Sequence, residues 1–233
     1  MSDYKNIYLN HAEEYDLLVS KEDTDGNLLR SIGEVRPLNG IDVVEFGAGT
    51  GRLTALMAPH VRSIRAFDLF EPMIAFARSK LARTGFSNVV CGVADNGSLP
   101  VEDGSADLSI AGWSFGHCTA WYTDDWRSRI ASAIDEMMRV LRPDGVSIII
   151  ETLGTGYEKP FTPRSELGAY YRALVDEWGF RHTWFRTDYL FDSIAQGKHL
   201  LRLFWSDELV KVFSSRGSTG FPECTGLWWK QPS

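Results

Sequence analysis

The chain of 233 residues has only three cysteines, and Cys91, Cys118 and Cys224 lie far apart in no paired motif. An odd number of isolated thiols argues against a disulfide framework and favours a reducing compartment. The first ten residues lack the basic and then apolar build of a signal peptide, and no apolar run approaches the length that spans a bilayer. We therefore expect a soluble, cytoplasmic protein without a membrane partner.

Basic residues are also scarce. The 24 lysines and arginines are outnumbered by 31 aspartates and glutamates, which gives a net charge of −7. Without a basic run the chain lacks the electrostatic footprint of a nucleic-acid binder, so we expect no nucleic-acid partner. His117 stands next to Cys118, but no other histidine has the spacing of a metal ligand, so we expect no metal site. The sequence leaves the oligomeric state open.

What the chain does have is a regular alternation of short apolar segments and amphipathic ones, with 44% hydrophobic residues overall. Alternation of this kind predicts right-handed βαβ units and a doubly wound, mostly parallel sheet of the α/β class. Strands are expected at 41–46, 63–67, 88–93, 106–111 and 146–150, with helices at 52–58, from Pro72 to Gly85 and from Thr123 to Arg139. A turn is expected at Arg142–Gly145.

Further elements flank this alternating region. A helix is expected over 8–19 and another over 27–35. After Glu151 we expect a helix at 165–178 and two closing strands, 180–186 and 223–229, which bring the sheet to seven strands. No shift in composition marks a boundary, so residues 1–233 are interpreted as one domain. Its parts are an N-terminal helical cap (1–38), the alternating core, and substrate-side elements with the closing strands (152–233).

The glycine-rich run Glu45–Leu53, with the sequence EFGAGTGRL, ends the first strand and opens a helix. Glycines let the backbone turn sharply there and let a ligand lie against main-chain N–H groups. Ligands of open α/β sheets bind outside the carboxyl ends of the strands, so a nucleotide-like ligand is expected. Arg52 stands where a dinucleotide fingerprint has its last glycine, and the run also lacks the Gly-Lys-Ser/Thr ending of a phosphate-binding loop.

Acidic side chains follow successive strands of the predicted sheet. Glu45 precedes the first glycine, where a carboxylate would repel a pyrophosphate and attract an ammonium group. Asp68 ends the second strand, where it could accept from both ribose hydroxyls of a nucleoside. Asp95, followed by Asn96, lies past the third strand, where it could accept from an adenine amino group. Each acid alone is more often a solvated strand end or a helix cap, but their joint placement at successive strand ends favours a nucleoside.

Four segments resemble the motifs of class I S-adenosylmethionine-dependent methyltransferases, in the order of that family. The segments are 43–54, 67–73, 94–96 with 99–101, and 139–145, within a resemblance that extends from about Tyr15 to Glu151. The resemblance implies a Rossmann-like methyltransferase fold with an antiparallel last strand. It also implies S-adenosylmethionine as cofactor, and the ammonium and sulfonium groups of that molecule suit the acidic strand ends.

The same resemblance implies roles in cofactor binding. The glycine loop would hold the methionine part, Asp68 the ribose, Leu69 and Met73 the adenine ring, and Asp95 the adenine amino group. Trp113 would border the sulfonium, and the N-terminal helices could close over the cofactor or else pack on the sheet. The residues expected to bind the cofactor are Tyr15, Glu45, Gly47, Ala48, Gly49, Gly51, Asp68, Leu69, Met73, Ala94, Asp95, Asn96 and Trp113.

Catalysis of methyl transfer can rest largely on positioning, which is worth about 7–11 kcal/mol in well-oriented systems. A base is needed only when the acceptor is a hydroxyl or a protonated amine. In the loop after the fourth strand, His117 is the first candidate base because its side chain titrates near neutral pH. Its alternative role is a structural histidine that bonds a backbone carbonyl. Glu151 is the second candidate, with a helix cap or loop anchor as its alternative.

The sequence thus predicts methyl transfer from S-adenosylmethionine to a small-molecule acceptor, with the accepting atom undetermined. The tail resembles a bacterial subgroup of small methyltransferases through 187–189 and 222–229, which implies no particular substrate. Two alternatives stay open. One is a non-catalytic protein that binds the cofactor as a sensor, and the other is a nucleotide-linked oxidoreductase, which Arg52 and Asp95 oppose.

Overall fold

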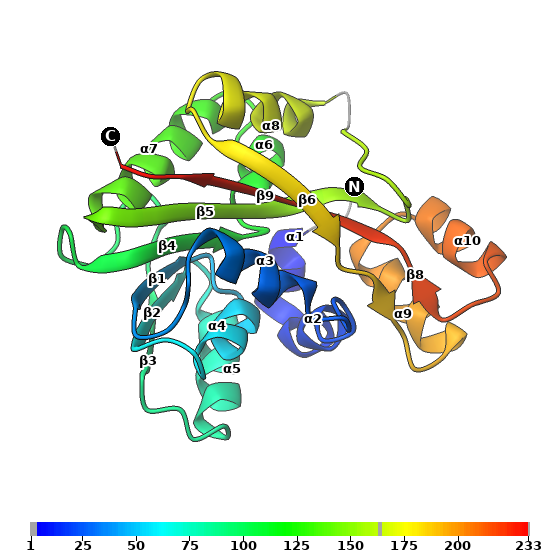
Figure 1. Cartoon of the computed structure of the whole chain (residues 1–233). Helices are drawn as coiled ribbons and strands as arrows, with labels where there is room; N and C mark the ends of the chain where they lie inside the picture. Colours follow the sequence, from blue (N-terminus) through cyan, green and yellow to red (C-terminus); the bar gives the residue numbers. More distant parts are fainter. Residues whose placement is uncertain (1–3, 163–164, 233) are drawn as a thin grey trace.

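The computed structural model describes residues 4–162 and 165–232, and a seven-stranded sheet forms its centre (Figure 1). The strands lie in the order β3-β2-β1-β4-β5-β9-β6. Neighbours among β1 to β5 pair in parallel, whereas β9 runs antiparallel to both β5 and β6. The α/β fold predicted from the sequence, with its antiparallel last strand, is therefore confirmed. The strands are β1 Asp42–Phe46, β2 Ser63–Asp68, β3 Val89–Val93, β4 Ala106–Gly112, β5 Leu141–Thr155, β6 Arg181–Arg186 and β9 Glu223–Lys230.

The strand order places a crevice at the carboxyl ends of the central strands β1 and β4. From β1 the chain moves outward through β2 and β3 and then returns to β4 on the other side of β1. At such a switch point the connections leave the carboxyl ends of β1 and β4 in opposite directions, which opens a crevice between them.

Helices cover both faces of the sheet, and alternate residues of each strand point to opposite faces. On one face, α3 (Asn27–Val35) and α4 (Arg52–Met57) pack against side chains such as Val43 and Ile148. On the other face, α7 (Trp126–Arg139) and α8 (Glu166–Asp176) pack against side chains such as Val44 and Ile149. Because both faces are covered, the central strands are mostly apolar. The connection from β2 to β3 is α5 (Glu71–Ala82).

A third apolar cluster lies beyond the sheet and joins the N-terminal helices to residues 189–221, which form a lobe before the last strand. It combines α1 and α2 with a C-terminal lobe, drawn in orange at the right of Figure 1. Ile7 and Leu18 from the N-terminal helices are buried together with Leu201, Phe213 and Phe221 of the lobe. The first two helices therefore pack against both α5 and this lobe, and α3 packs on the sheet. The elements are α1 Tyr4–Asn10, α2 Ala12–Val19, β7 Tyr189–Leu190, α9 Ile194–Phe204, α10 Asp207–Ser215 and β8 Gly220–Phe221. In the described part of the chain no helix is long and apolar enough to cross a membrane.

Three local predictions were wrong. The single helix expected over 8–19 is two helices, because His11 leaves the helical region with φ −132° and ψ 38°. The helix expected to start at Thr123 starts at Trp126, because the Asp125 amide bonds the Tyr122 carbonyl and closes a turn first.

The third wrong prediction is the turn at Arg142–Gly145, which lies inside β5. Leu141 pairs with Ala106 while Val146 pairs with Leu108, so the extra residues form a bulge in a continuous strand. The two-stranded sheet of β7 and β8 was not predicted, because strands of two residues carry no periodic signal.

Packing around β9 generates a stability prediction. Gly226 lies on β9, which pairs with β5 on one side and β6 on the other. A Cβ at this position would meet ring atoms of Trp228 at 2.5 Å and Cδ1 of Leu153 at 2.8 Å. We expect Gly226→Ala to lower the free energy of unfolding by roughly 1–3 kcal/mol, as overpacking of a core does. The matched variant is Gly33→Ala in α3, where an added Cβ has no neighbour within 4 Å and should stabilise the helix by roughly 0.5–1 kcal/mol. Urea denaturation measures both, and equal effects of the two substitutions would contradict the steric argument.

Candidate active site

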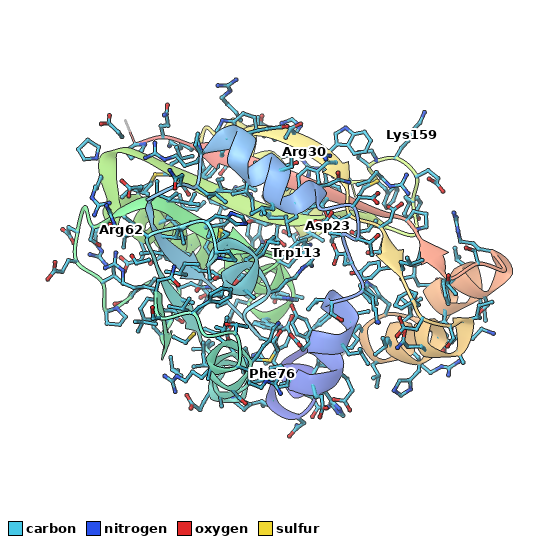
Figure 2. All side chains as sticks on the ribbon, turned by 60° about the horizontal axis from the view of Figure 1, so that its bottom comes forward. Asp23, Arg30, Arg62, Phe76, Trp113 and Lys159 are labelled. Carbon is cyan, nitrogen blue, oxygen red and sulfur yellow. The ribbon has the colours of Figure 1, made fainter. Side chains whose placement is uncertain are left out.

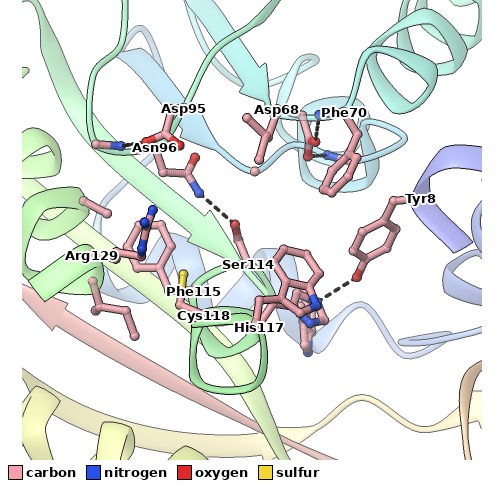
Figure 3. Close-up of a pocket in the computed structure, with 18 of the residues that line it drawn as sticks. Tyr8, Asp68, Phe70, Asp95, Asn96, Ser114, Phe115, His117, Cys118 and Arg129 are labelled. Atoms are coloured by element: carbon pink, nitrogen blue, oxygen red, sulfur yellow. Dashed lines mark hydrogen bonds between the residues drawn. The ribbon is translucent and has the colours of Figure 1, made fainter. Parts of the chain in front are cut away.

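A cavity of about 190 Å³, the first cavity, opens at the carboxyl ends of β1, β2 and β4 (Figure 3). Segments that follow four successive parallel strands line it, together with Tyr8 and Tyr15 from the N-terminal helices. This is the place where the topology of the sheet predicts a ligand. Of the residues expected to bind the cofactor, those that line the first cavity are Tyr15, Gly47, Gly49, Asp68, Leu69, Met73, Asp95, Asn96 and Trp113.

The glycine loop owes its shape to close contacts. Gly47 and Gly49 have φ angles of 66° and 55°, in the left-handed region that favours glycine. A Cβ at Gly47 would lie 2.0 Å from Oγ of Ser114, so the loop after β1 approaches the loop after β4 more closely than another residue would allow. Tyr15 lies over Gly49, with Cε1 3.6 Å from the position of a Cβ.

Asp68 joins the glycine loop to the end of β2. The Gly49 amide donates to Oδ2 and the Phe70 amide donates to Oδ1, each at 2.8 Å. Asp68 is only 8% exposed, and burial raises the pKa of its carboxyl. Since a carboxylate has about four acceptor positions, Asp68 can bond these amides and still accept from ligand hydroxyls.

Side chains from three strand ends complete the first cavity. Leu69 is 48% exposed beside it, whereas Met73 is buried beneath. Asp95 accepts from the Gly97 amide at 2.8 Å, and Nδ2 of Asn96 donates to Oγ of Ser114 at 3.1 Å. Oδ1 of Asn96 is buried and has no hydrogen-bond partner among the residues that the structure describes. A ligand donor would satisfy this oxygen.

Four of the residues expected to bind the cofactor do not line the cavity: Glu45, Ala48, Gly51 and Ala94. Glu45 is buried and accepts from Oγ1 of Thr54 at 2.5 Å, and burial raises the pKa of its carboxyl to about 8. A Cβ at Gly51 would lie 3.3 Å from Cβ of Ala77, so this glycine allows α5 to pack closely. The Ala48 and Ala94 amides donate to carbonyls of β2.

Trp113 occupies a strained position directly after β4. It has a φ of 50°, which is rare for a bulky residue, and its amide donates to the Ile150 carbonyl at 2.7 Å. The guanidinium of Arg52 lies 4.4 Å from the centre of its ring. Figure 2 labels Trp113 near the middle of the molecule, whereas Arg62 and Lys159 lie at its periphery. The strained turn thus directs an aromatic ring toward the interior.

His117 is held by a hydrogen bond to the N-terminal helix. Nε2 lies 2.7 Å from the Tyr8 hydroxyl (Figure 3), and the backbone carbonyl of Trp113 opposes the lowering of the imidazole pKa. In the tautomer that carries its proton on Nδ1, Nε2 accepts from Tyr8. The ring of Trp121 stacks on the imidazole with centroids 4.9 Å apart. Burial lowers the pKa of His117 to about 4, so the imidazole is neutral at pH 7.

A second cavity of about 540 Å³ adjoins the first, and both are lined by Tyr8, Tyr15, Trp113 and His117. Glu151, near the middle of β5, lines the second cavity and is 4% exposed. Its Oε1 accepts from the Gly116 amide at 2.8 Å, so Glu151 anchors the loop that carries His117. Burial raises the pKa of Glu151 to about 8.

Charged residues of the second cavity that sequence reasoning missed include Glu22, Arg52 and Glu223. Nη1 of Arg52 lies 2.8 Å from Oε2 of Glu22 in a buried ion pair. Arg52 stood out only as a departure from the dinucleotide fingerprint, and no local pattern marks the two glutamates. Among the described residues no cluster of histidine, cysteine and acidic side chains could hold a metal ion.

Comparison with known proteins identifies the family. Residues 44–149 match the family model described as a methyltransferase domain. A malonyl-[acyl-carrier protein] O-methyltransferase of Methylococcus capsulatus is 33% identical over 105 residues, which are 44% of this chain and 34% of that protein. A methyltransferase-like protein of Schizosaccharomyces pombe is also 33% identical, over 44% of this chain and 35% of its own length.

Among solved structures, a putative methyltransferase from Bacillus halodurans superposes with a TM-score of 0.60 at 17% identity, covering 89% of this chain and all of that one. The family match over residues 44–149 and the shared fold confirm the resemblance to class I S-adenosylmethionine-dependent methyltransferases. The matches cover only 27% to 52% of the length of the curated relatives.

The burial of His117 generates a prediction about its titration. Because its pKa is lowered, the imidazole should stay neutral from pH 8 down to about pH 5 and take up a proton only near pH 4. The Cε1–H signal, followed by NMR over this range and assigned with a His117→Gln variant, measures the transition. A midpoint above pH 6 would show that water reaches the ring.

Proposed function

We propose that the protein binds S-adenosylmethionine in the first cavity and transfers its methyl group to a small molecule in the second. The observation that carries this proposal is the boundary that the two cavities share, formed by Tyr8, Tyr15, Trp113 and His117. Methyl transfer is an in-line displacement, so donor and acceptor must approach the methyl carbon from opposite sides. Two adjoining cavities with a common boundary suit that requirement.

The residues of the first cavity suit this cofactor. Asp68 has acceptor positions for the ribose hydroxyls, and Leu69 and Met73 offer apolar surface to the adenine ring. The unpartnered oxygen of Asn96 offers an acceptor for the adenine amino group. Aromatic rings such as Trp113 favour a neighbouring cation. When bound, the cofactor supplies an electrophilic methyl group on a sulfonium.

The role proposed for Asp68 is tested by Asp68→Asn. We expect the variant to bind S-adenosylhomocysteine more weakly by on the order of 1–3 kcal/mol, because the ribose hydroxyls lose a charged acceptor. Isothermal titration calorimetry measures the change. Because Asp68 is buried and bonds the Gly49 amide, the free energy of unfolding is measured in parallel. Asp176→Asn, an exposed site on α8, is the matched control, and equal affinity in both variants would contradict the assignment.

On the acceptor side, His117 and Tyr8 form a pair that can move a proton. In the tautomer with its proton on Nδ1, Nε2 of His117 accepts from the Tyr8 hydroxyl, whose oxygen can take a proton from the acceptor while its own proton passes to the imidazole. The lowered pKa makes the imidazolium short-lived and returns the proton readily. Glu151, the second candidate, supports the loop of His117 through the Gly116 amide.

The proposed activity is tested with methyl-labelled cofactor and a pool of small amines, alcohols and carboxylic acids. We expect labelled product from the wild-type protein, and a rate lowered roughly 10²–10⁴-fold by His117→Gln, the usual worth of acid–base catalysis. Cofactor affinity should barely change in that variant. His199→Gln, at an exposed site on α9, is the control and should keep the wild-type rate.

The outcomes separate the competing hypotheses. Tight cofactor binding without transfer to any acceptor would favour the sensor. Full activity of the His117→Gln variant would favour positioning alone over proton transfer. The family match opposes the oxidoreductase alternative. The cytoplasmic location, the single-domain organisation and the lack of a nucleic-acid partner stay predictions from the sequence.

A further inference from the structure

We propose that the second cavity receives its ligand through a protonated amine, and that Glu223 on β9 is the carboxylate that binds it. This inference rests on the proposed function, because the second cavity is the place assigned to the methyl acceptor. It goes further by naming the chemical class of that acceptor.

Glu223 is a buried carboxylate with one oxygen uncommitted. The residue is 2% exposed and lines the second cavity. Oε1 accepts from the Thr152 hydroxyl, but Oε2 is buried without a hydrogen-bond partner in the part of the chain that the structure describes. Native proteins rarely leave a buried polar atom unsatisfied, so this oxygen points to a donor supplied by a ligand.

The charges around Glu223 favour a cation as that donor. Glu22, Glu151 and Glu166 line the same cavity, and Arg52 is its one permanently charged cation among the described residues. Nη1 of Arg52 is engaged with Glu22, so that pair is neutral as a unit. Burial raises the pKa of the Tyr171 hydroxyl, which lies between α8 and this part of the sheet, and the charges of Glu151 and Glu223 add to the rise. The carboxyls of Glu151 and Glu223 therefore line the same cavity, and neither forms an ion pair with a described residue.

Aromatic side chains form much of the remaining wall. These side chains come from α1, from β7 and from the end of α9: Tyr4, Tyr8, Tyr189, Phe204 and Trp205. The faces of such rings attract a cation once it is out of water. Carboxylates on one side and ring faces on the other are the surroundings in which a buried ammonium is stable.

Arg52 adds a second requirement on the ligand. Its Nη2 is buried without a hydrogen-bond partner among the described residues, although it belongs to the same side chain that bonds Glu22. A donor in this position calls for a ligand oxygen. The class defined by both uncommitted atoms is a small amine that also carries a hydroxyl, carbonyl or carboxylate oxygen.

Binding of an amine to this site would change the protonation of Glu223. Burial and, after it, the charge of Glu22 raise the pKa of its carboxyl to about 8, against the opposing effect of the hydroxyls of Thr152 and Thr155 and the charge of Arg52. The hydroxyls of Tyr171 and Tyr189 also face this carboxyl. At pH 7 the empty site is thus mostly protonated. An incoming ammonium stabilises the carboxylate, so the proton leaves to solvent as the amine binds.

The experiment compares ligands that share a skeleton and differ in one group. The small set is ethanolamine, ethylene glycol and glycolate, and the large set is phenylalaninol, 3-phenylpropane-1,2-diol and phenyllactate. Binding to the full chain is measured by calorimetry, with and without saturating S-adenosylhomocysteine. We expect the amine of at least one set to bind at least about tenfold more tightly than its diol, and the acid to bind most weakly.

Proton release gives a readout that mere packing would not move. Calorimetry in buffers of different ionisation enthalpy should show up to about one proton released per amine bound at pH 7, and clearly fewer at pH 9, where most of the carboxyl is already ionised. Glu223→Gln keeps the shape and removes the charge, so both the amine preference and the proton release should disappear. Glu208→Gln, at an exposed site on α10, should keep both.

Three results would overturn the proposal: no amine of either set binds, amine and diol bind equally, or the preference survives Glu223→Gln. Affinity for S-adenosylhomocysteine, measured in each variant, shows that the fold is retained. If the wild-type protein fails to bind S-adenosylhomocysteine, the proposed function is wrong. The measurements without cofactor still decide whether the second cavity selects amines.

Discussion

The buried ion pair between Arg52 and Glu22 holds together the parts of the chain from which the site is built. Its side chains are 16% and 3% exposed, and it joins the residue after the glycine loop to the segment after α2. Glu22 also accepts from the Thr187 hydroxyl, which in turn bonds Thr225 on β9. Loss of one partner from a buried pair typically costs about 3–5 kcal/mol, because the other charge stays in a medium of low polarity. The cofactor loop, the N-terminal helices and the last strand are thus coupled through one interaction.

The same pair fixes the boundary between the two cavities, because the guanidinium of Arg52 lies against the ring of Trp113. Trp113 needs such support, since its positive φ costs on the order of 1–3 kcal/mol. The glycine loop on the other side is held by Asp68 through the Gly49 amide. The backbone around the first cavity is therefore shaped by the protein itself, and a ligand need not order it.

Burial acts in opposite directions on the acids and the base of the site, and the result is a low net charge. It lowers the pKa of His117 and raises those of Glu151 and Glu223, so that each of the three groups favours its neutral form near pH 7. A cation that enters these surroundings would favour the ionised form of the carboxyls of Glu151 and Glu223.

The sequence by itself determined the βαβ order, the glycine loop and the strand-end position of Asp68, because these follow from local periodicity and from motifs of consecutive residues. It also determined the family, since the motifs lie within one segment. Only the tertiary structure decided that Glu45 and Gly51 do not line the first cavity and that β7 pairs with β8. It alone also brought Glu22, Arg52 and Glu223 to the wall of one cavity. Thr187 lies 165 residues from the glutamate that it bonds, and Arg52 lies 30 residues from that same glutamate. No local pattern encodes contacts over such separations, because they exist only when the packed sheet brings distant segments together.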